Sequence, residues 1–259
     1  MRSIKARLCA TALLSAVVLV RADRTASAQA PVPAAPEHVS WYGDPSAPDI
    51  SGVWVRADDQ ATPSGSKEGW QPWPPPLKDE FAATWAKRVA AAQAGKRTDD
   101  PVVDCVRPGM PRFITGMTGP LLIVQSHARL TIYRDGEAPR RIWLDGRTFP
   151  DEKSLESFPK GTSIGQYRDG NVLIETRGFK DYPIDSTGVP HSDDLKIMER
   201  YHRVDPHTLS AEVTLIDPIA YAQPLVTTVT YKLLDDAMWA PREFICAPKT
   251  NSHPELFVH

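Results

Sequence analysis

Glycine and cysteine are scarce in this chain, whereas proline is abundant. The 259 residues include 15 glycines and three cysteines but 25 prolines. Because proline interrupts helix interiors and central strands, this balance argues against a helical bundle and predicts long loops. No two cysteines have the C-x-x-C spacing of a zinc site. No motif indicates a cofactor, and we expect none.

The N-terminal segment has the layout of a secretory signal peptide. Basic residues stand at positions 2, 5 and 7, an apolar run covers 8–20, and Ala26-Ser27-Ala28 is a small-x-small cleavage site. We expect cleavage after Ala28 and a periplasmic or secreted protein. An uncleaved anchor is the alternative, but a run of 13 residues is short for a bilayer. No later segment is apolar enough to cross a membrane.

Removal of residues 1–28 makes the chain acidic. Five basic residues and one acidic residue leave with the signal, so 25 basic and 31 acidic residues remain. A mildly acidic exported protein has no electrostatic reason to bind nucleic acid. We therefore expect no nucleic-acid partner; the partner that we expect, from the barrel-like fold predicted below, is a small-molecule ligand or substrate.

The two remaining cysteines, Cys105 and Cys246, can form only one pair. Their even number in an oxidising compartment predicts a disulfide. A bridge closing about 140 residues would stabilise the fold by roughly 4–5 kcal/mol in the loop-entropy model. The alternative is two unpaired, buried thiols.

The mature chain divides into a leader, one domain and a tail. Residues 29–48 are rich in Ala, Pro and Ser and predict a flexible leader. Residues 49–250 form the expected domain, and 251–259 form the tail. The spacing of Leu77, Phe81, Trp85 and Val89 predicts one helix over 77–94, which would pack its apolar stripe on a sheet.

Short alternating segments separated by turn residues predict about ten strands. The Asp169-Gly170 pair gives the strongest hairpin signal. We expect a mainly β fold, either an antiparallel up-and-down barrel or a curved sheet, with the helix inserted after the first strand. The expected strands are 49–55, 121–125, 129–134, 140–144, 163–168, 171–178, 195–204, 209–216, 225–234 and 243–246.

The Gly52-x-Trp54 start followed by an antiparallel meander resembles lipocalin-type barrels. This likeness concerns architecture alone, because Gly-x-Trp is a weak motif. The chain also departs from lipocalins, since about 65 residues of loop and helix follow the first strand.

A more specific resemblance is to a family of exported bacterial proteins without an assigned activity. It implies a fold and no chemistry. Members of that family usually have histidine where Thr162 stands here, which puts a role for this segment in doubt. The resembling segments are Asp49-Ile-Ser-Gly-Val-Trp54, Cys105-x-x-Pro-Gly-Met-Pro-Arg112, Arg140-Arg-Ile-Trp-Leu-Asp-Gly-Arg147, Pro190-His-Ser-Asp193 and Glu199-Arg200.

The richest cluster of reactive side chains begins at His191. A loop histidine beside carboxylates can act as a general base, which Asp193 or Glu199 would orient. His191 and Asp193 could also start a metal site, but no standard spacing supplies further ligands, and we expect no metal. The competing interpretation is that these polar residues organise the turn before the next strand.

The strand that follows delivers ionisable groups to an apolar interior. If the next hairpin loop is even, Arg200 and His202 point inward, and if it is odd, Glu199 and Tyr201 do. Buried charge needs a partner, so these residues form either a structural ion pair or a ligand site. The candidate ligand-binding residues are Arg200, His202, Tyr201 and Trp54.

Residues 161–165 match the G-x-S-x-G pattern of serine hydrolases. That motif needs a strand, a sharp turn and a helix, whereas a strand and a hairpin follow here. The sequence therefore argues against Ser163 as a nucleophile.

Three functions remain open at this level. The first is an exported barrel that binds a small, largely apolar ligand. The alternative is a cofactor-independent acid–base enzyme, a lyase, isomerase or hydrolase, that uses His191 with Asp193 or Glu199. The third is an envelope protein that binds a partner through the Trp- and Pro-rich loop at 62–76.

Overall fold

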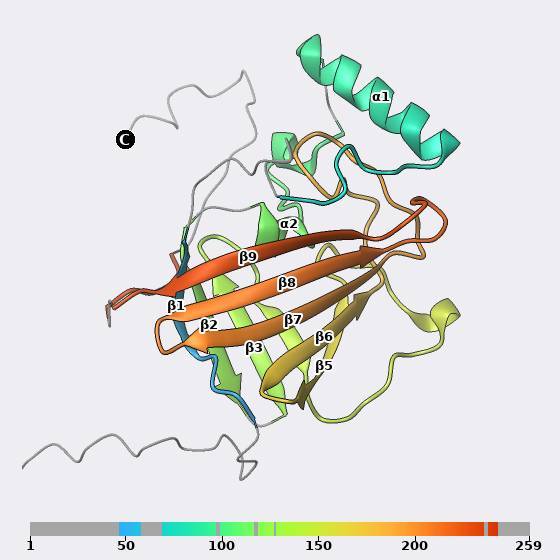
Figure 1. Cartoon of the computed structure of the whole chain (residues 1–259). Coiled ribbons are helices and arrows are strands. Elements are labelled where there is room, and N and C mark those ends of the chain that lie inside the picture. Colours follow the sequence, from blue (N-terminus) through green and yellow to red (C-terminus); the bar gives the residue numbers. More distant parts are fainter. Residues whose placement is uncertain are drawn as a thin grey trace, which may run out of the picture. The chain divides into compact units, whose positions relative to one another are not determined.

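The computed structural model describes residues 47–57, 69–96, 99–116, 119–126, 128–235 and 238–242, which belong to one compact unit. Nine strands form a closed barrel in which sequence neighbours pair and β1 closes against β9 (Figure 1). The predicted signal peptide, the expected strand 243–246 and the tail lie outside the described residues. The strands are β1 (Gly52–Arg56), β2 (Leu121–Ser126), β3 (Arg129–Arg134), β4 (Arg140–Trp143), β5 (Thr162–Arg168), β6 (Asn171–Arg177), β7 (Lys196–Asp205), β8 (Thr208–Ile216) and β9 (Leu225–Leu233).

The barrel confirms the predicted β class, but its pairing is mixed and not wholly antiparallel. Strands β4 and β5 run parallel, and they pair at only two positions, Ile142 with Ser163 and Trp143 with Ile164. The physical reason is the long connection 144–161, which includes the short helix η3 (Glu152–Ser154). A parallel pair needs a crossover of about a dozen residues or more, whereas a hairpin needs only two.

The hairpin predicted at Asp169-Gly170 is confirmed between β5 and β6. Both turn residues have positive φ, 50° and 71°. A two-residue turn with two positive φ angles matches the right-handed twist of the strands it joins, and Asp-Gly tolerates this conformation.

The two ends of the barrel differ in their connections. At one end, two-residue loops join β2 to β3, β5 to β6 and β7 to β8. At the other end, which we call the loop end, lie the described parts of the connection between β1 and β2 (69–96, 99–116 and 119–120), the segments 178–195 and 217–224, and the short turn before β4. The crossover 144–161 also returns to the loop end, and Figure 1 shows these connections gathered there. Ligand sites on rigid scaffolds are disproportionately built from such loops.

The described residues between β1 and β2 form two α-helices and the short helix η2 (Pro101–Asp104). The helix α2 (Arg112–Thr115) is buried along its whole length. The phenol of Tyr231 donates to the carbonyl of Ile114 at 2.9 Å. Because Tyr231 points into the barrel from β9, this bond joins α2 to the inner face of the sheet.

The helix α1 (Asp79–Gln93) confirms the single long helix predicted over 77–94. None of its residues is fully buried, so the expected core packing is only partial. Trp85 contacts Trp73 edge-on at 5.7 Å, and its indole nitrogen donates to the Thr187 hydroxyl at 3.1 Å. The apolar stripe thus packs on loops at the loop end. Within the described residues, no helix has both the length and the apolar composition needed to cross a membrane.

Candidate functional site

An ion pair lies inside the barrel near the loop end. Arg140 and Glu199 expose only 2% and 3% of their surfaces. The Nη1 of Arg140 donates to Oε1 of Glu199 at 2.8 Å, and its Nη2 donates to Oε2. This two-pronged geometry is the strong form of an arginine–carboxylate contact, which offsets part of the cost of burying both charges.

Two hydroxyl groups complete the contacts of this ion pair. The Ser163 hydroxyl accepts from Nε and Nη2 of Arg140 at 3.3 and 3.1 Å. The Thr176 hydroxyl accepts from Nη2 at 2.9 Å and lies 2.9 Å from the Ser163 hydroxyl. Because Ser163 accepts two bonds with its two lone pairs, its hydroxyl proton is directed at the Thr176 hydroxyl and not at a general base. Ser163 lies on β5 with no helix behind it, as the sequence indicated, and acts here as a hydrogen-bonding group.

Tyr201 belongs to the same cluster. Its hydroxyl donates to Oε1 of Glu199 at 3.1 Å. Burial, aided by the nearby charge of Glu199, raises the pKa of Tyr201 well above its ordinary value. Burial by itself would lower the pKa of Arg140, but the charge and hydrogen bonds of Glu199 raise it. Tyr201 is therefore a neutral donor and Arg140 a permanent cation.

The register of β7 decides between the two orientations that the sequence left open. Glu199 and Tyr201 point inward, whereas Arg200 and His202 lie on the exposed outer face. The hairpin loop has only two residues, but a bulge at Val204 shifts the pairing so that Arg203 lies opposite Leu209. A one-residue shift moves every side chain to the other face of a strand.

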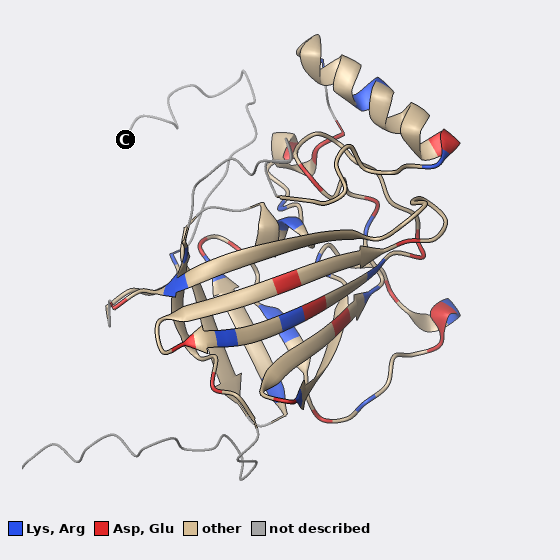
Figure 2. Ribbon diagram, in the orientation of Figure 1, with Lys and Arg blue, Asp and Glu red and all other residues tan. Residues whose placement is uncertain are grey.

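The outward position makes Arg200 and His202 unsuitable as interior ligand residues, which corrects that alternative. Arg200 forms a surface ion pair with Glu212 at 3.1 Å. Figure 2 shows basic and acidic residues along β7 and an acidic residue on β8. Such exposed pairs contribute little to stability.

Trp54, the other candidate ligand residue, is part of the packed core. It is completely buried, and its indole nitrogen donates to the carbonyl of Ile50 at 3.0 Å. The guanidinium of Arg203 lies 5.3 Å from the centre of its ring. These contacts use both its polar atom and its ring face for packing.

His191 lies in the loop before β7, where the structure favours an organising role. Its Nδ1 is 2.7 Å from the carbonyl of Ser192, and its Nε2 is 3.1 Å from the carbonyl of Lys180. The ring is 93% buried and packs edge-on against Phe179. Because both nitrogens face backbone carbonyls, neither is directed at a substrate. Within the described residues, no hydrogen bond or ion pair joins the His191 ring to Asp193 or Glu199, so their acid–base role stays a prediction.

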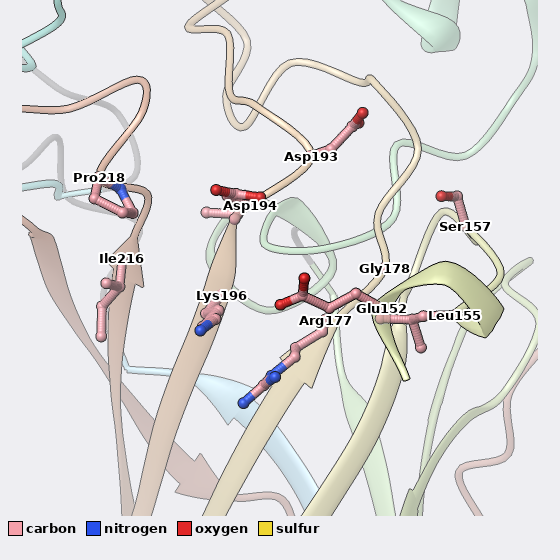
Figure 3. A pocket seen from close by; sticks show the side chains of 11 residues that line it. Glu152, Leu155, Ser157, Arg177, Gly178, Asp193, Asp194, Lys196, Ile216 and Pro218 are labelled. Atoms are coloured by element: carbon pink, nitrogen blue, oxygen red, sulfur yellow. The ribbon is translucent and has the colours of Figure 1, made fainter. Parts of the chain in front are cut away.

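Asp193 lines an open groove of about 390 Å³ at the loop end (Figure 3). The side chains that line this groove come mainly from the loop before β7, the start of β7, the end of β6 and η3, as Figure 3 shows. Acidic and basic groups are mixed in it, and Arg177 already pairs with Glu175 at 2.5 Å. The lining residues are Glu152, Leu155, Ser157, Arg177, Gly178, Asp193, Asp194, Leu195, Lys196, Ile216 and Pro218.

A second cavity, of about 410 Å³, opens where β4 and β5 separate at the loop end. Most of its exposed lining is apolar, and Trp143, Phe158 and two prolines supply much of it. Arg140 and Ser163 connect it to the buried cluster. We call it the β4–β5 cavity. Its lining residues are Ala138, Pro139, Arg140, Arg141, Trp143, Phe158, Pro159, Lys160, Gly161, Thr162 and Ser163.

The wall of the β4–β5 cavity is fixed by the segment that contains Pro108-Gly109-Met110. The amide of Met110 donates to the carbonyl of Pro159 at 2.9 Å. Gly109 has φ of 71°, and a Cβ there would lie 1.8 Å from the same carbonyl oxygen. Only glycine allows this close approach, so Gly109 holds the Pro159 side of the cavity in place.

The described residues contain no group of three or more His, Cys, Asp or Glu side chains that could hold a metal ion. No protein-family model, curated protein or solved structure matches this chain. The resemblances noted from the sequence stay predictions. The segments that carry the more specific one are 49–54, 105–112, 140–147, 190–193 and 199–200. They include Arg140, Glu199 and His191, which lie at or near the loop end.

Sequence reasoning did not single out Arg140 as an interior residue. A signal was present, because Arg140 and Ile142 alternate onto one face of β4, and Ile142 belongs in the core. No sequence pattern indicates the cavity. It depends on how far β4 and β5 diverge between their two paired positions and the loop end.

Proposed function

We propose that this protein is an exported binding protein for a small, largely apolar molecule, which it holds in the β4–β5 cavity. The observation that carries the proposal is an apolar cavity of about 410 Å³ that reaches a buried polar cluster. Ligand sites are typically 300–1,000 Å³, largely apolar, and supplied with a few well-placed polar groups.

The interior of the barrel does not offer an equivalent site within the described residues. Large side chains fill it, including Trp54, Tyr201 and Tyr231, and the ion pair of Arg140 and Glu199 occupies its polar part. Small barrels are commonly filled by their own side chains in this way. The ligand is therefore placed in the barrel wall, at the gap between two strands.

The groove at Asp193 is a weaker candidate for an apolar ligand. Its exposed lining is more polar than apolar, and charges of both signs line it. An apolar molecule would have to displace water from those charged groups, which costs free energy without a matching gain. A ligand in the β4–β5 cavity displaces water from fewer polar groups than a ligand in the groove at Asp193 would.

Export and a Cys105–Cys246 disulfide belong to the same proposal. The support is the layout of residues 1–28 and the two cysteines that remain after cleavage. Cys246 lies outside the described residues, so its pairing stays a prediction. Mass measurement of alkylated, unreduced protein tests it: a bridged protein takes up no alkyl group on either cysteine, and two alkyl groups would disprove the bridge.

Native mass spectrometry of the protein purified from a bacterial periplasm tests the binding function. We expect an organic adduct on the wild type and on Gln166→Trp, and none on Thr162→Trp. Thr162 lines the cavity, so a tryptophan there fills it. Gln166 lies on the same strand, also on its outer side, but does not line the cavity.

An adduct that survives in Thr162→Trp would place the ligand elsewhere. If the wild type carries no adduct, titration with octan-1-ol decides, because an apolar cavity of this size should bind it. No binding of octan-1-ol or octanoate at millimolar concentration would contradict the proposed function.

A further inference from the structure

The charges that line the β4–β5 cavity have one sign. Its eleven lining residues include Arg140, Arg141 and Lys160 but neither Asp nor Glu. The groove at Asp193 differs, because three acidic and two basic residues line it. A cavity lined by one sign of charge concentrates ligands of the opposite sign.

Two of these three cations already have partners. Arg140 is neutralised by Glu199 inside the barrel. The ammonium of Lys160 lies 2.7 Å from Oε2 of Glu137 and 2.7 Å from the carbonyl of Ala138. It also lies 4.8 Å from the centre of the Phe113 ring. Neither charge is therefore available to a ligand without loss of a contact.

Arg141 is the third cation, and its charge is not compensated. It is exposed on the outer face of β4, and the described part of the chain gives it no hydrogen bond and no ion pair. Neighbouring arginines differ in this respect, since Arg147 pairs with Asp145 and Arg129 lies over the Trp143 ring. A guanidinium without a carboxylate is suited to bind one from a ligand in two-pronged geometry.

Apolar surface lies on the same cavity. Phe158 is 47% exposed although it is a large hydrophobic residue, and Trp143, Pro139 and Pro159 line the cavity with it. Several apolar residues that line one cavity together form the kind of surface that a ligand covers. The cavity thus presents one uncompensated cation beside an apolar wall.

We propose that the ligand of the β4–β5 cavity is an anionic amphiphile, namely a monocarboxylic acid with an aliphatic or aromatic body. Its carboxylate binds the guanidinium of Arg141, and its body covers Phe158 and Pro159. The face of the Trp143 ring is not part of the site, because the guanidinium of Arg147 already lies 3.9 Å from the ring centre. This inference rests on the proposed function, since it names the ligand class of the same cavity.

Calorimetric titration with octanoate and with octan-1-ol tests it, because the two share an apolar chain and differ in the charged group. The wild type should bind octanoate up to about fivefold more tightly than octan-1-ol, because an ion pair at an exposed arginine is worth at most about that factor. Arg141→Gln should abolish that preference while the affinity for octan-1-ol stays unchanged. Arg141→Lys should keep part of the preference, because lysine retains the positive charge but cannot bind a carboxylate in two-pronged geometry.

Arg168→Gln is the matched control. Arg168 is also an exposed arginine on the outer side of a strand, but it does not line this cavity. Its replacement should leave both affinities unchanged. Thermal unfolding of each variant verifies that the exposed substitutions leave the fold intact.

The outcomes separate the inference from the function on which it rests. Equal binding of octanoate and octan-1-ol by the wild type, or an undiminished preference in Arg141→Gln, would overturn the anion site and leave the apolar cavity standing. Failure of both compounds to bind would overturn the proposed function and this inference together.

Discussion

Arg140 on β4 and Glu199 on β7 meet inside the barrel, although 59 residues separate them in the chain. Strands β5 and β6 lie between them in the sheet, so the contact crosses the interior. The ion pair links β4, on one side of the parallel pairing of β4 with β5, to β7, on the other side. The pair thereby supports the wall in which the β4–β5 cavity opens.

Removal of the Glu199 charge should destabilise the fold strongly. Glu199→Gln leaves the Arg140 cation buried without a counterion, and breaking a buried pair in this way costs about 3–5 kcal/mol. Glu212→Gln is the control, because Glu212 pairs with Arg200 on the surface, and its loss should cost less than about 1 kcal/mol. Urea unfolding measures both. Equal effects of the two substitutions would show that the interior pair is not a structural support.

The buried tyrosines should make stability fall in alkaline solution. Burial raises the pKa of Tyr201, Tyr221 and Tyr231, with the charge of Glu199 adding to it at Tyr201 and those of Asp217 and Asp185 at Tyr221. Above about pH 10 the unfolded chain releases phenolic protons that the native protein retains. The unfolded state then binds fewer protons, so the free energy of unfolding decreases as the pH rises.

Unfolding curves recorded between neutral pH and pH 11 check this prediction. Tyr201→Phe should make the alkaline decrease shallower, because each such group contributes up to about 1.4 kcal/mol per pH unit. Tyr133→Phe, on the outer side of β3, provides the comparison. An identical slope for wild type and Tyr201→Phe would refute the role given to Tyr201.

The sequence predicted a mainly β fold, either a barrel or a curved sheet, because hydrophobic alternation and turn residues are local signals. Asp169-Gly170 specified its hairpin through backbone conformation alone. The parallel junction was missed because strand direction depends on where the crossover 144–161 runs, which no local pattern encodes. The bulge at Val204 was missed for a similar reason, and it alone decided which side of β7 faces the interior.

His191 should prove important for folding and unimportant for binding. Replacement by alanine leaves the carbonyls of Ser192 and Lys180 without their partner and should cost about 1–3 kcal/mol. The affinity for octanoate should stay within twofold of the wild type. His202→Ala, on the exposed face of β7, should change stability by less than about 0.5 kcal/mol. A stable His191→Ala protein that had lost an acid–base activity would instead support the enzyme hypothesis.

Asp217 organises the loop end, and its replacement should also destabilise the fold. Its carboxylate is buried and accepts bonds from the amide and hydroxyl of Ser192 and from the amides of Ile219 and Ala220. Asp217→Ala should therefore cost about 2–3 kcal/mol in chemical unfolding. Asp194→Ala serves as the control, because Asp194 is exposed and should change stability by less than about 0.5 kcal/mol. A loss below 1 kcal/mol for Asp217→Ala would show that the loop keeps its structure without these bonds.

The candidate site was less predictable than the fold. The sequence correctly indicated that one strand brings ionisable groups into the barrel, and Glu199 with Tyr201 does so. The partner of Glu199 could not be named, since Arg140 reaches it across the interior from a distant strand. The cluster at His191 attracted attention through residue types, yet its hydrogen bonds go to the backbone.

The location of the bound ligand is the central claim, and amide chemical shifts test it most directly. In a titration of isotopically labelled protein with octanoate, the largest shifts should fall in residues 138–143 and 158–163, which line the β4–β5 cavity. Largest shifts in residues 193–196 would place the ligand in the groove at Asp193 instead and contradict the account.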